Sequence, residues 1–202
     1  MAQYYFDMDG VLAVYDRAGY LPASAGETPA YLKPGYFCNR AIDERACYAF
    51  LRMLYENQYD TPEHTIRCLT TLSSTGSLFV QQYHDKNKWL YQMFQHMKER
   101  YPENFLTEQD KHFLESNKQI IVPAVTNKHQ IVDTLNSKSL NLNQILIDDY
   151  NENLIEWKKA GGLAIKYLNG INSPDSWNGP CIDPDMSAND IINFLKCLSY
   201  SL

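Results

Sequence analysis

Two aspartates separated by one residue follow the first apolar segment of the chain. Residues 4–6, all aromatic, lead directly into Asp7, Met8, Asp9 and Gly10. In an extended chain, residues i and i+2 face the same side, so both carboxylates are predicted to project into one site at the carboxyl end of a strand. One carboxylate can attack phosphorus, while the other protonates the leaving oxygen and later activates water. The pattern predicts Asp7 as a nucleophile and Asp9 as a general acid and base.

A turn or a calcium loop is the alternative for the same residues. The further oxygen ligands and the distal glutamate of an EF-hand do not follow Gly10. Gly10 permits a sharp backbone turn and a close approach to a ligand. On these residues alone, a simple turn without chemistry stays open.

A second pair of acids, Asp148 and Asp149, follows the apolar residues 145–147. Mg²⁺ prefers oxygen ligands, so a carboxylate from the first strand and one from a neighbouring strand can hold this ion beside a substrate phosphate. Adjacent residues point to opposite faces of an ideal strand, so only one acid of this pair is expected to be a direct ligand. We favour Asp148, with Asp149 binding through water or bracing the site. The alternative is a solvated turn before a helix.

Short apolar segments alternate with helical patterns along the chain, which predicts an α/β fold with βαβ units and a largely parallel sheet. The expected strands are residues 4–6, 65–70, 120–125, 144–147 and 163–168. The expected helices are residues 42–55, the stretch around 89–97, residues 152–160 with Asn151 as N-cap, and residues 189–198. The stretch between the first two strands is longer than a crossover helix needs, so it is predicted to form a cap over the active edge of the sheet.

Composition limits the classes of protein to which the chain can belong. Its 202 residues, 45% hydrophobic and 21% charged, suffice for one core and a small insertion. The net charge of −6 offers no basic face for duplex nucleic acid. No apolar run is long enough for a membrane span and no signal-type segment is present, so we expect a cytoplasmic protein. Five scattered cysteines without a CxxC pair argue against disulfides and zinc knuckles.

The two acidic motifs resemble those of a known superfamily. Residues 7–12 are similar to the first motif of haloacid dehalogenase-type (HAD) hydrolases, and Asp148-Asp149 is similar to their fourth. The second motif, a strand ending in Thr or Ser, is similar to residues 66–71, with the phosphate-binding hydroxyl placed on Thr70 or, as second choice, Thr71. Within the superfamily, residues 33–37 and the Lys86-x-x-Trp89 pattern resemble the cytosolic-type 5′(3′)-deoxyribonucleotidases.

This resemblance implies a Rossmann-like, three-layer core with a parallel sheet, formed by residues 1–13 and 62–202, and a small helical cap formed by residues 14–61. It also implies that Mg²⁺ is held by the Asp7 carboxylate, the Asp9 backbone carbonyl and Asp148. In the cap, Tyr36 and Phe37 are expected to line the pocket, where an aromatic face can stack on a nucleobase. The alternative is that both rings belong to the core of the cap.

Two lysines compete for the third motif, the cation that pairs with Asp7 and the substrate phosphate. Lys128 comes shortly after the strand expected at 120–125, near the edge where the other motifs gather. Lys86 lies in a helical pattern whose Trp89 faces the core, so its ammonium group is expected to be solvated. We therefore predict Lys128 as the catalytic lysine.

Together these features predict a Mg²⁺-dependent phosphomonoesterase that acts on a small phosphorylated metabolite through an aspartyl-phosphate. A (deoxy)nucleoside 5′-monophosphate is the favoured substrate, and a sugar phosphate or another small phosphomonoester is the alternative. A catalytically silent binding module on the same fold is the rival from another class. Neither duplex nucleic acid nor a membrane is expected as a partner, and a homodimer is left open.

Overall fold

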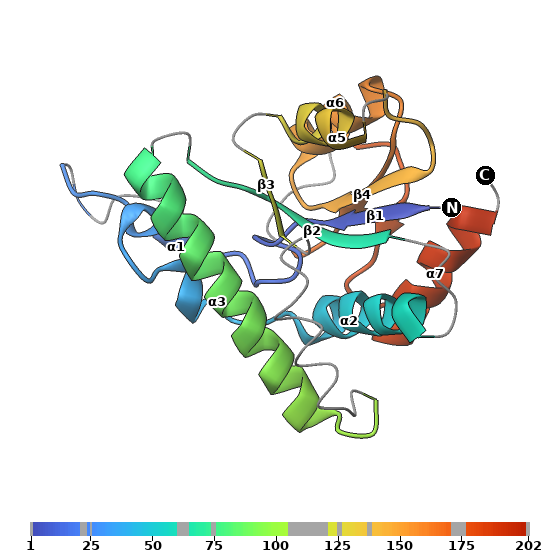
Figure 1. The fold of residues 1–202 in the computed structure, drawn as a ribbon, viewed down its shortest axis with the longest axis horizontal. Helices are drawn as coiled ribbons and strands as arrows, with labels where there is room; N and C mark the ends of the chain where they lie inside the picture. Colours follow the sequence, from blue (N-terminus) through green and yellow to red (C-terminus); the bar gives the residue numbers. More distant parts are fainter. Residues whose placement is uncertain are drawn as a thin grey trace.

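A six-stranded parallel sheet forms the centre of the protein, in the order β3-β2-β1-β4-β5-β6 (Figure 1). The computed structural model describes residues 2–20, 24, 26–59, 65–73, 76–104, 121–124, 127–136, 139–170 and 177–200, and all statements below concern these residues. The strands are β1 (Gln3–Phe6), β2 (Thr65–Thr71), β3 (Ile121–Ala124), β4 (Gln144–Asp148), β5 (Leu163–Tyr167) and β6 (Cys181–Ile182). The parallel sheet confirms the predicted α/β class.

Helices cover both faces of the sheet, which gives three layers (Figure 1). One face carries α2 (Glu44–Tyr59) and α7 (Ala188–Tyr200), and the other carries α5 (Lys128–Asn136) and α6 (Asn151–Lys159). Tyr4 and Phe6 pack on the first pair of helices and Tyr5 on the second. A strand covered on both faces has no solvated side, which is why residues 4–6 and 145–147 are aromatic or apolar throughout. No helix in the described residues is both long and apolar enough to cross a membrane.

The segment that follows β1 is held in place by α3 (Gly76–Arg100), which runs beside it in Figure 1. This segment contains α1 (Arg17–Tyr20) and the short 3₁₀ helices η1 (Ala30–Leu32) and η2 (Phe37–Asn39). The buried Asp85 carboxylate on α3 accepts a hydrogen bond from the Gly35 backbone N–H at 2.8 Å. One turn further along, the Trp89 indole N–H donates to the Arg40 carbonyl at 2.8 Å.

The predicted strands and helices are present, but α1 and α5 were not predicted, and α3 spans 25 residues where only the stretch around 89–97 was expected. Helix α6 begins at Asn151, so its N-cap is Tyr150 rather than the predicted Asn151. The Asn151 side chain accepts a hydrogen bond from Lys166 instead. Gly161, with φ of 102°, ends this helix region as its sequence indicates. The two-residue β6 was not predicted because so short a segment has no periodicity, and residues 120 and 125 of the predicted third strand lie outside the described residues.

The stretch predicted as a cap, residues 14–61, contains two kinds of structure. Helix α2 packs on β2 and α7, and its residues Ala46, Cys47 and Phe50 belong to the main core cluster. The residues before it, which include α1, η1 and η2, contribute Tyr15, Tyr31, Leu32 and Phe37 to a pocket at the carboxyl edge of the sheet. The division of the chain into core and cap stays a prediction.

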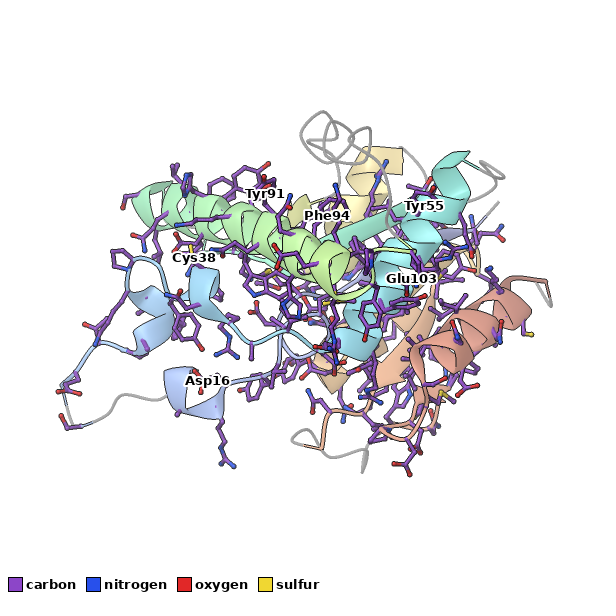
Figure 2. The ribbon with its side chains drawn as sticks, turned by 90° about the horizontal axis from the view of Figure 1, so that it is seen from below. Asp16, Cys38, Tyr55, Tyr91, Phe94 and Glu103 are labelled. Carbon is purple, nitrogen blue, oxygen red and sulfur yellow. The ribbon has the colours of Figure 1, made fainter. Side chains whose placement is uncertain are left out.

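The five cysteines are free thiols in very different surroundings. Cys47 and Cys68 are fully buried, and burial raises the pKa of both thiols, that of Cys68 to about 12. Cys38 is half-buried on η2, and its thiol contacts Asp85 of α3 (Figure 2). Cys197 is exposed on α7.

We expect these cysteines to differ in their rate of reaction with a thiol reagent. Because the thiolate is the reactive form, iodoacetamide at pH 8 should modify Cys197 first and leave Cys47 and Cys68 intact in the folded protein. Peptide mass spectrometry would measure the modification, and the same reaction in denaturant, where all five should react, is the control. Rapid modification of Cys68 under native conditions would contradict the packing described here.

Candidate active site

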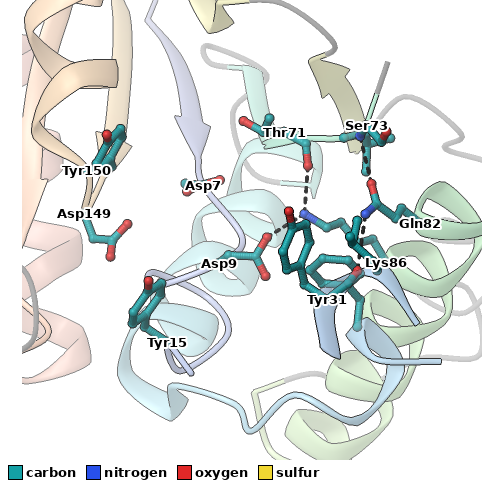
Figure 3. Close-up of a pocket in the computed structure, with 13 residues that line it drawn as sticks. Asp7, Asp9, Tyr15, Tyr31, Thr71, Ser73, Gln82, Lys86, Asp149 and Tyr150 are labelled. Carbon is teal, nitrogen blue, oxygen red and sulfur yellow. Dashed lines mark hydrogen bonds and ion pairs between the residues drawn. The ribbon is translucent and has the colours of Figure 1, made fainter. Parts of the chain in front are cut away.

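The acidic motifs meet at the carboxyl edge of the sheet, where they border a pocket of about 510 Å³. Asp7 and Asp9 follow β1, Thr71 ends β2, and Asp149 follows β4 (Figure 3). In a parallel sheet these carboxyl ends lie side by side, and ligands bind in the crevice outside them. The structure therefore places both acids of the first motif on the wall of one pocket, as their spacing predicts.

Lys128, the first residue of α5, lies between two of the acids. Its ammonium nitrogen is 2.7 Å from the Asp7 carboxylate and 2.7 Å from the Asp148 carboxylate. Burial alone would lower the pKa of Lys128, but the charges of Asp148 and Asp7 outweigh it and hold this pKa above its usual value. Lys128 is thus a fixed positive charge next to the predicted nucleophile.

Burial raises the pKa of Asp7, and the Lys128 charge only partly opposes this effect. The carboxylates of Asp148, Asp9 and Asp149 raise it further, since like charges disfavour another negative charge nearby. A divalent cation at this position would favour the ionised Asp7 that nucleophilic attack requires.

The donor set at this edge fits such a cation. Carboxylate oxygens of Asp7, Asp148 and Asp149 lie within 4.8 Å of one another, and all three residues are buried. Hard cations such as Mg²⁺ bind oxygen ligands of this kind, usually with some water retained. Among the described residues, these acids can hold the metal that the sequence predicts.

Asp148 is the last residue of β4 and Asp149 follows it, and the two side chains differ in direction. Asp148 is fully buried and its carboxylate accepts hydrogen bonds from Lys128, Asn153 and the Tyr150 backbone N–H. Asp149 lines the pocket, and Asn169 donates a hydrogen bond to its carboxylate at 2.8 Å. The pair thus separates as adjacent strand residues should, but Asp149, rather than the favoured Asp148, faces the pocket.

Lys86 is not solvated, and this prediction was wrong. Only 1% of its surface is exposed, and its ammonium nitrogen lies 2.5 Å from the Asp9 carboxylate and 2.7 Å from the Thr70 hydroxyl. The ammonium group also lies 4.4 Å from the centre of the Phe37 ring. The sequence held a signal for this position, because Lys86 shares one helix face with Gln82, Trp89, Leu90 and Met93, all buried.

The two threonines of the second motif have separate surroundings. Thr70 is fully buried, and its hydroxyl accepts the hydrogen bond from Lys86. Thr71 lines the pocket, and its carbonyl accepts a second hydrogen bond from Lys86 at 3.0 Å (Figure 3). Of the two threonines, the second choice, Thr71, is the one that lines the pocket.

The aromatic residues predicted from the cap are only partly at the pocket. Phe37 lines it, but the Tyr36 hydroxyl bonds to Asp16 and Arg40, and its ring packs against Gly19. Three tyrosines that the sequence analysis did not select, Tyr15, Tyr31 and Tyr150, line the pocket instead (Figure 3). Tyr15 and Tyr150 lie outside helices and strands, and Tyr31 lies in the three-residue η1, so no periodicity indicates the direction of these side chains.

The fold was compared with solved structures, and the chain has a HAD-like α/β fold. The solved structure that carries this conclusion is D,D-heptose 1,7-bisphosphate phosphatase from B. bronchiseptica, crystallised with magnesium and phosphate. It has a TM-score of 0.57 and 11% identity over 98% of this chain and 99% of that one. The corresponding enzyme from Burkholderia thailandensis matches with a TM-score of 0.48 and 11% identity, over 96% of this chain and 99% of that one. A HAD-superfamily hydrolase from Ehrlichia chaffeensis matches with a TM-score of 0.46 and 16% identity, over 97% of this chain and 96% of that one. No protein-family model and no curated protein sequence matches the chain.

Proposed function

We propose that the chain is a Mg²⁺-dependent phosphomonoesterase that hydrolyses a small phosphorylated metabolite, with Asp7 as the nucleophile. The observation that carries this proposal is the position of Asp7. It lines the pocket, contacts Lys128 at 2.7 Å, and has the Asp148 and Asp149 carboxylates within 4.8 Å. The likeness in fold to a phosphatase crystallised with magnesium and phosphate supports the same conclusion.

In the first half of the proposed reaction, an Asp7 oxygen attacks phosphorus and the bond from phosphorus to the leaving oxygen breaks. Asp9 gives its proton to that oxygen, so a neutral alcohol departs and the phosphoryl group stays on Asp7. In the second half, Asp9 takes a proton from water, which attacks phosphorus and frees Asp7 and inorganic phosphate. Lys86 holds Oδ2 of Asp9 at 2.5 Å, and among the described residues the buried Oδ1 has no hydrogen-bond partner. Oδ1 is therefore the oxygen that we propose for proton transfer.

The metal would be held by the carboxylates of Asp7 and Asp149, with the Asp9 backbone carbonyl as a further ligand. Asp148 is engaged by Lys128 and Asn153 and is proposed to brace the site. When bound, Mg²⁺ supplies positive charge to the transferring phosphoryl group. The side chains of Lys128 and Lys86, which pair with Asp7 and Asp9, add two further positive charges near this group.

The favoured substrate remains a (deoxy)nucleoside 5′-monophosphate. Beyond its acidic edge, the pocket is lined by Tyr15, Tyr31, Phe37 and Tyr150, which offer faces and edges to a flat base. Gln82, also on the wall, is bound to the Ser73 backbone N–H and the Tyr31 carbonyl. These contacts connect Tyr31 and the residues after β2 to α3.

A sugar bisphosphate is the second candidate, because the structural relative is named for one. The charges on the pocket wall disfavour it. The described lining residues carry the acids Asp7, Asp9 and Asp149 and a single cation, Lys86, which is already paired with Asp9. A second phosphate would face tyrosines and uncharged polar groups, so we propose a substrate with one phosphate.

The direct test is a panel of phosphomonoesters assayed with Mg²⁺ and again with excess chelator. The panel contains nucleoside and deoxynucleoside 5′-monophosphates, a hexose 6-phosphate and a hexose 1,6-bisphosphate. We expect chelator-sensitive release of phosphate, with the highest kcat/KM for a nucleotide and a value at least about tenfold lower for the bisphosphate. Preference for the bisphosphate would move the proposal to the second candidate, and no hydrolysis of any ester would remove it.

Stacking in the pocket leads to a separate prediction for Tyr31→Ala. Stacking of a base on an aromatic ring contributes roughly 1–3 kcal/mol in single-strand systems, so KM for a nucleotide should rise about tenfold or more. KM for deoxyribose 5-phosphate, which lacks the base, should change less than about twofold. Tyr91→Ala, on an exposed position of α3, is the matched control. An equal rise in KM for both substrates would argue against stacking on Tyr31.

The bounds of the cap, the location of the protein and its oligomeric state are further proposals. Because α2 packs on the sheet, we propose that the cap comprises the residues between β1 and α2 rather than the whole of 14–61. The cytoplasmic location and a homodimer stay predictions, and light scattering of the purified protein would decide the second.

A further inference from the structure

The segment that follows β5 contributes a side chain, Asn169, to the loops that carry the acids. Asn169 lies two residues beyond the end of β5. Its amide nitrogen donates to the Asp149 carboxylate at 2.8 Å and to the Gly10 carbonyl at 3.0 Å. One side-chain amide thus joins the loop after β1 to the loop after β4.

These two loops are in direct contact at the point that Asn169 bridges. A Cβ atom built on Gly10 would lie 2.2 Å from the Asp149 carboxylate, so only glycine fits there. On the other side of the loop, the buried Lys166 ammonium donates to the Asp149 carbonyl at 2.7 Å. The backbone of Asp149 is therefore fixed by Lys166, and its carboxylate by Asn169.

We propose that Asn169 is a positioning residue that holds the Asp149 carboxylate toward Asp7 for metal binding. This inference rests on the metal site of the proposed function. Three buried carboxylates within 4.8 Å repel one another, and repulsion favours rotamers that turn Asp149 away. A neutral amide donor opposes that rotation without neutralising the charge that a cation needs.

The geometry also explains why an amide suits this position. The Asn169 NH₂ group has two hydrogens, so it can donate to both oxygens at once. An aspartate at 169 could donate to neither and would add another negative charge. Partners of metal-binding side chains typically change metal affinity by 10–100-fold when they are removed.

The test is direct metal binding by the purified full-length chain, with Mn²⁺ as a spectroscopic probe for Mg²⁺. In a titration followed by electron paramagnetic resonance, Asn169→Ala should weaken Mn²⁺ binding about tenfold or more relative to wild type. Asn87→Ala is the matched control, because that half-buried amide donates to the Tyr83 carbonyl on α3 at 2.7 Å. Its Mn²⁺ affinity should stay within about twofold of wild type.

A double variant separates positioning from a general loss of structure. If Asn169 acts through the Asp149 carboxylate, then Asn169→Ala should change Mn²⁺ affinity less than about twofold in an Asp149→Ala background. Unchanged Mn²⁺ affinity in Asn169→Ala, or equal losses in both backgrounds, would overturn the inference. The proposed function fails by a different result, namely absence of phosphatase activity in the wild-type protein, so the two failures are distinguishable.

Discussion

Replacing Asp7 by asparagine is expected to abolish phosphatase activity, with a loss on the order of 10⁴-fold or more in kcat. The amide is nearly isosteric with the carboxylate, but it is a poor nucleophile and cannot form the aspartyl-phosphate. It also removes one of the carboxylates grouped within 4.8 Å, so binding of the metal should weaken as well. Steady-state assays at saturating Mg²⁺ with the best substrate of the panel would measure the loss.

Asp9→Asn is the informative comparison for this variant. It leaves the nucleophile in place and removes only the proton transfer, which typically contributes 10²–10⁴-fold. Circular dichroism and thermal unfolding of both variants would show whether the fold is kept. Turnover near that of wild type in Asp7→Asn would exclude Asp7 as the nucleophile and with it the central proposal.

The positions of the acids could be predicted from sequence because strand ends are simple to locate. Residues 4–6 and 145–147 are continuous aromatic or apolar runs, and each ends at an acidic pair. In a parallel sheet these ends meet at one edge whatever the details of the helices. That the two acidic pairs meet at one edge therefore follows from local patterns and one topological rule, whereas the choice of Asp149 over Asp148 for the pocket wall does not.

The surroundings of the acids depend on contacts that the local pattern does not contain. A lysine in a helix is usually solvated, but Lys86 is enclosed because the segment carrying Phe37 covers α3 at that point. Its neighbour on the same helix, Asp85, is likewise buried, and its carboxylate accepts a hydrogen bond from the Gly35 N–H of the same segment. Asn169 joins the site only because β5 lies beside β4, an arrangement that sequence alone does not reveal.

Replacing either of the two buried lysines that pair with the acids, Lys86 or Lys128, gives the second large effect. Lys128→Met keeps most of the side-chain volume but leaves Asp7 and Asp148 without their shared cation. The charge that stabilises the transferring phosphoryl group is lost as well, and kcat/KM should fall several hundredfold. Removing one partner of a buried ion pair also costs about 3–5 kcal/mol of stability, so the free energy of unfolding must be measured in parallel.

The sequence alone predicted a solvated Lys86 without a catalytic role, and the structure changes this expectation. Because Lys86 holds the Asp9 carboxylate at 2.5 Å, Lys86→Met should lower kcat/KM about a hundredfold through misplacement of the proposed acid. If so, the double variant Lys86→Met/Asp9→Asn should be hardly slower than Asp9→Asn alone, since residues that act as a unit are not additive. Lys88→Met, two positions along the same helix and exposed, is the matched control and should stay within about twofold of wild type. A small effect of Lys86→Met beside a large effect of Lys128→Met would restore the prediction that Lys128 alone is the catalytic lysine. Fully additive losses in the double variant would show that Lys86 acts on the phosphate rather than through Asp9.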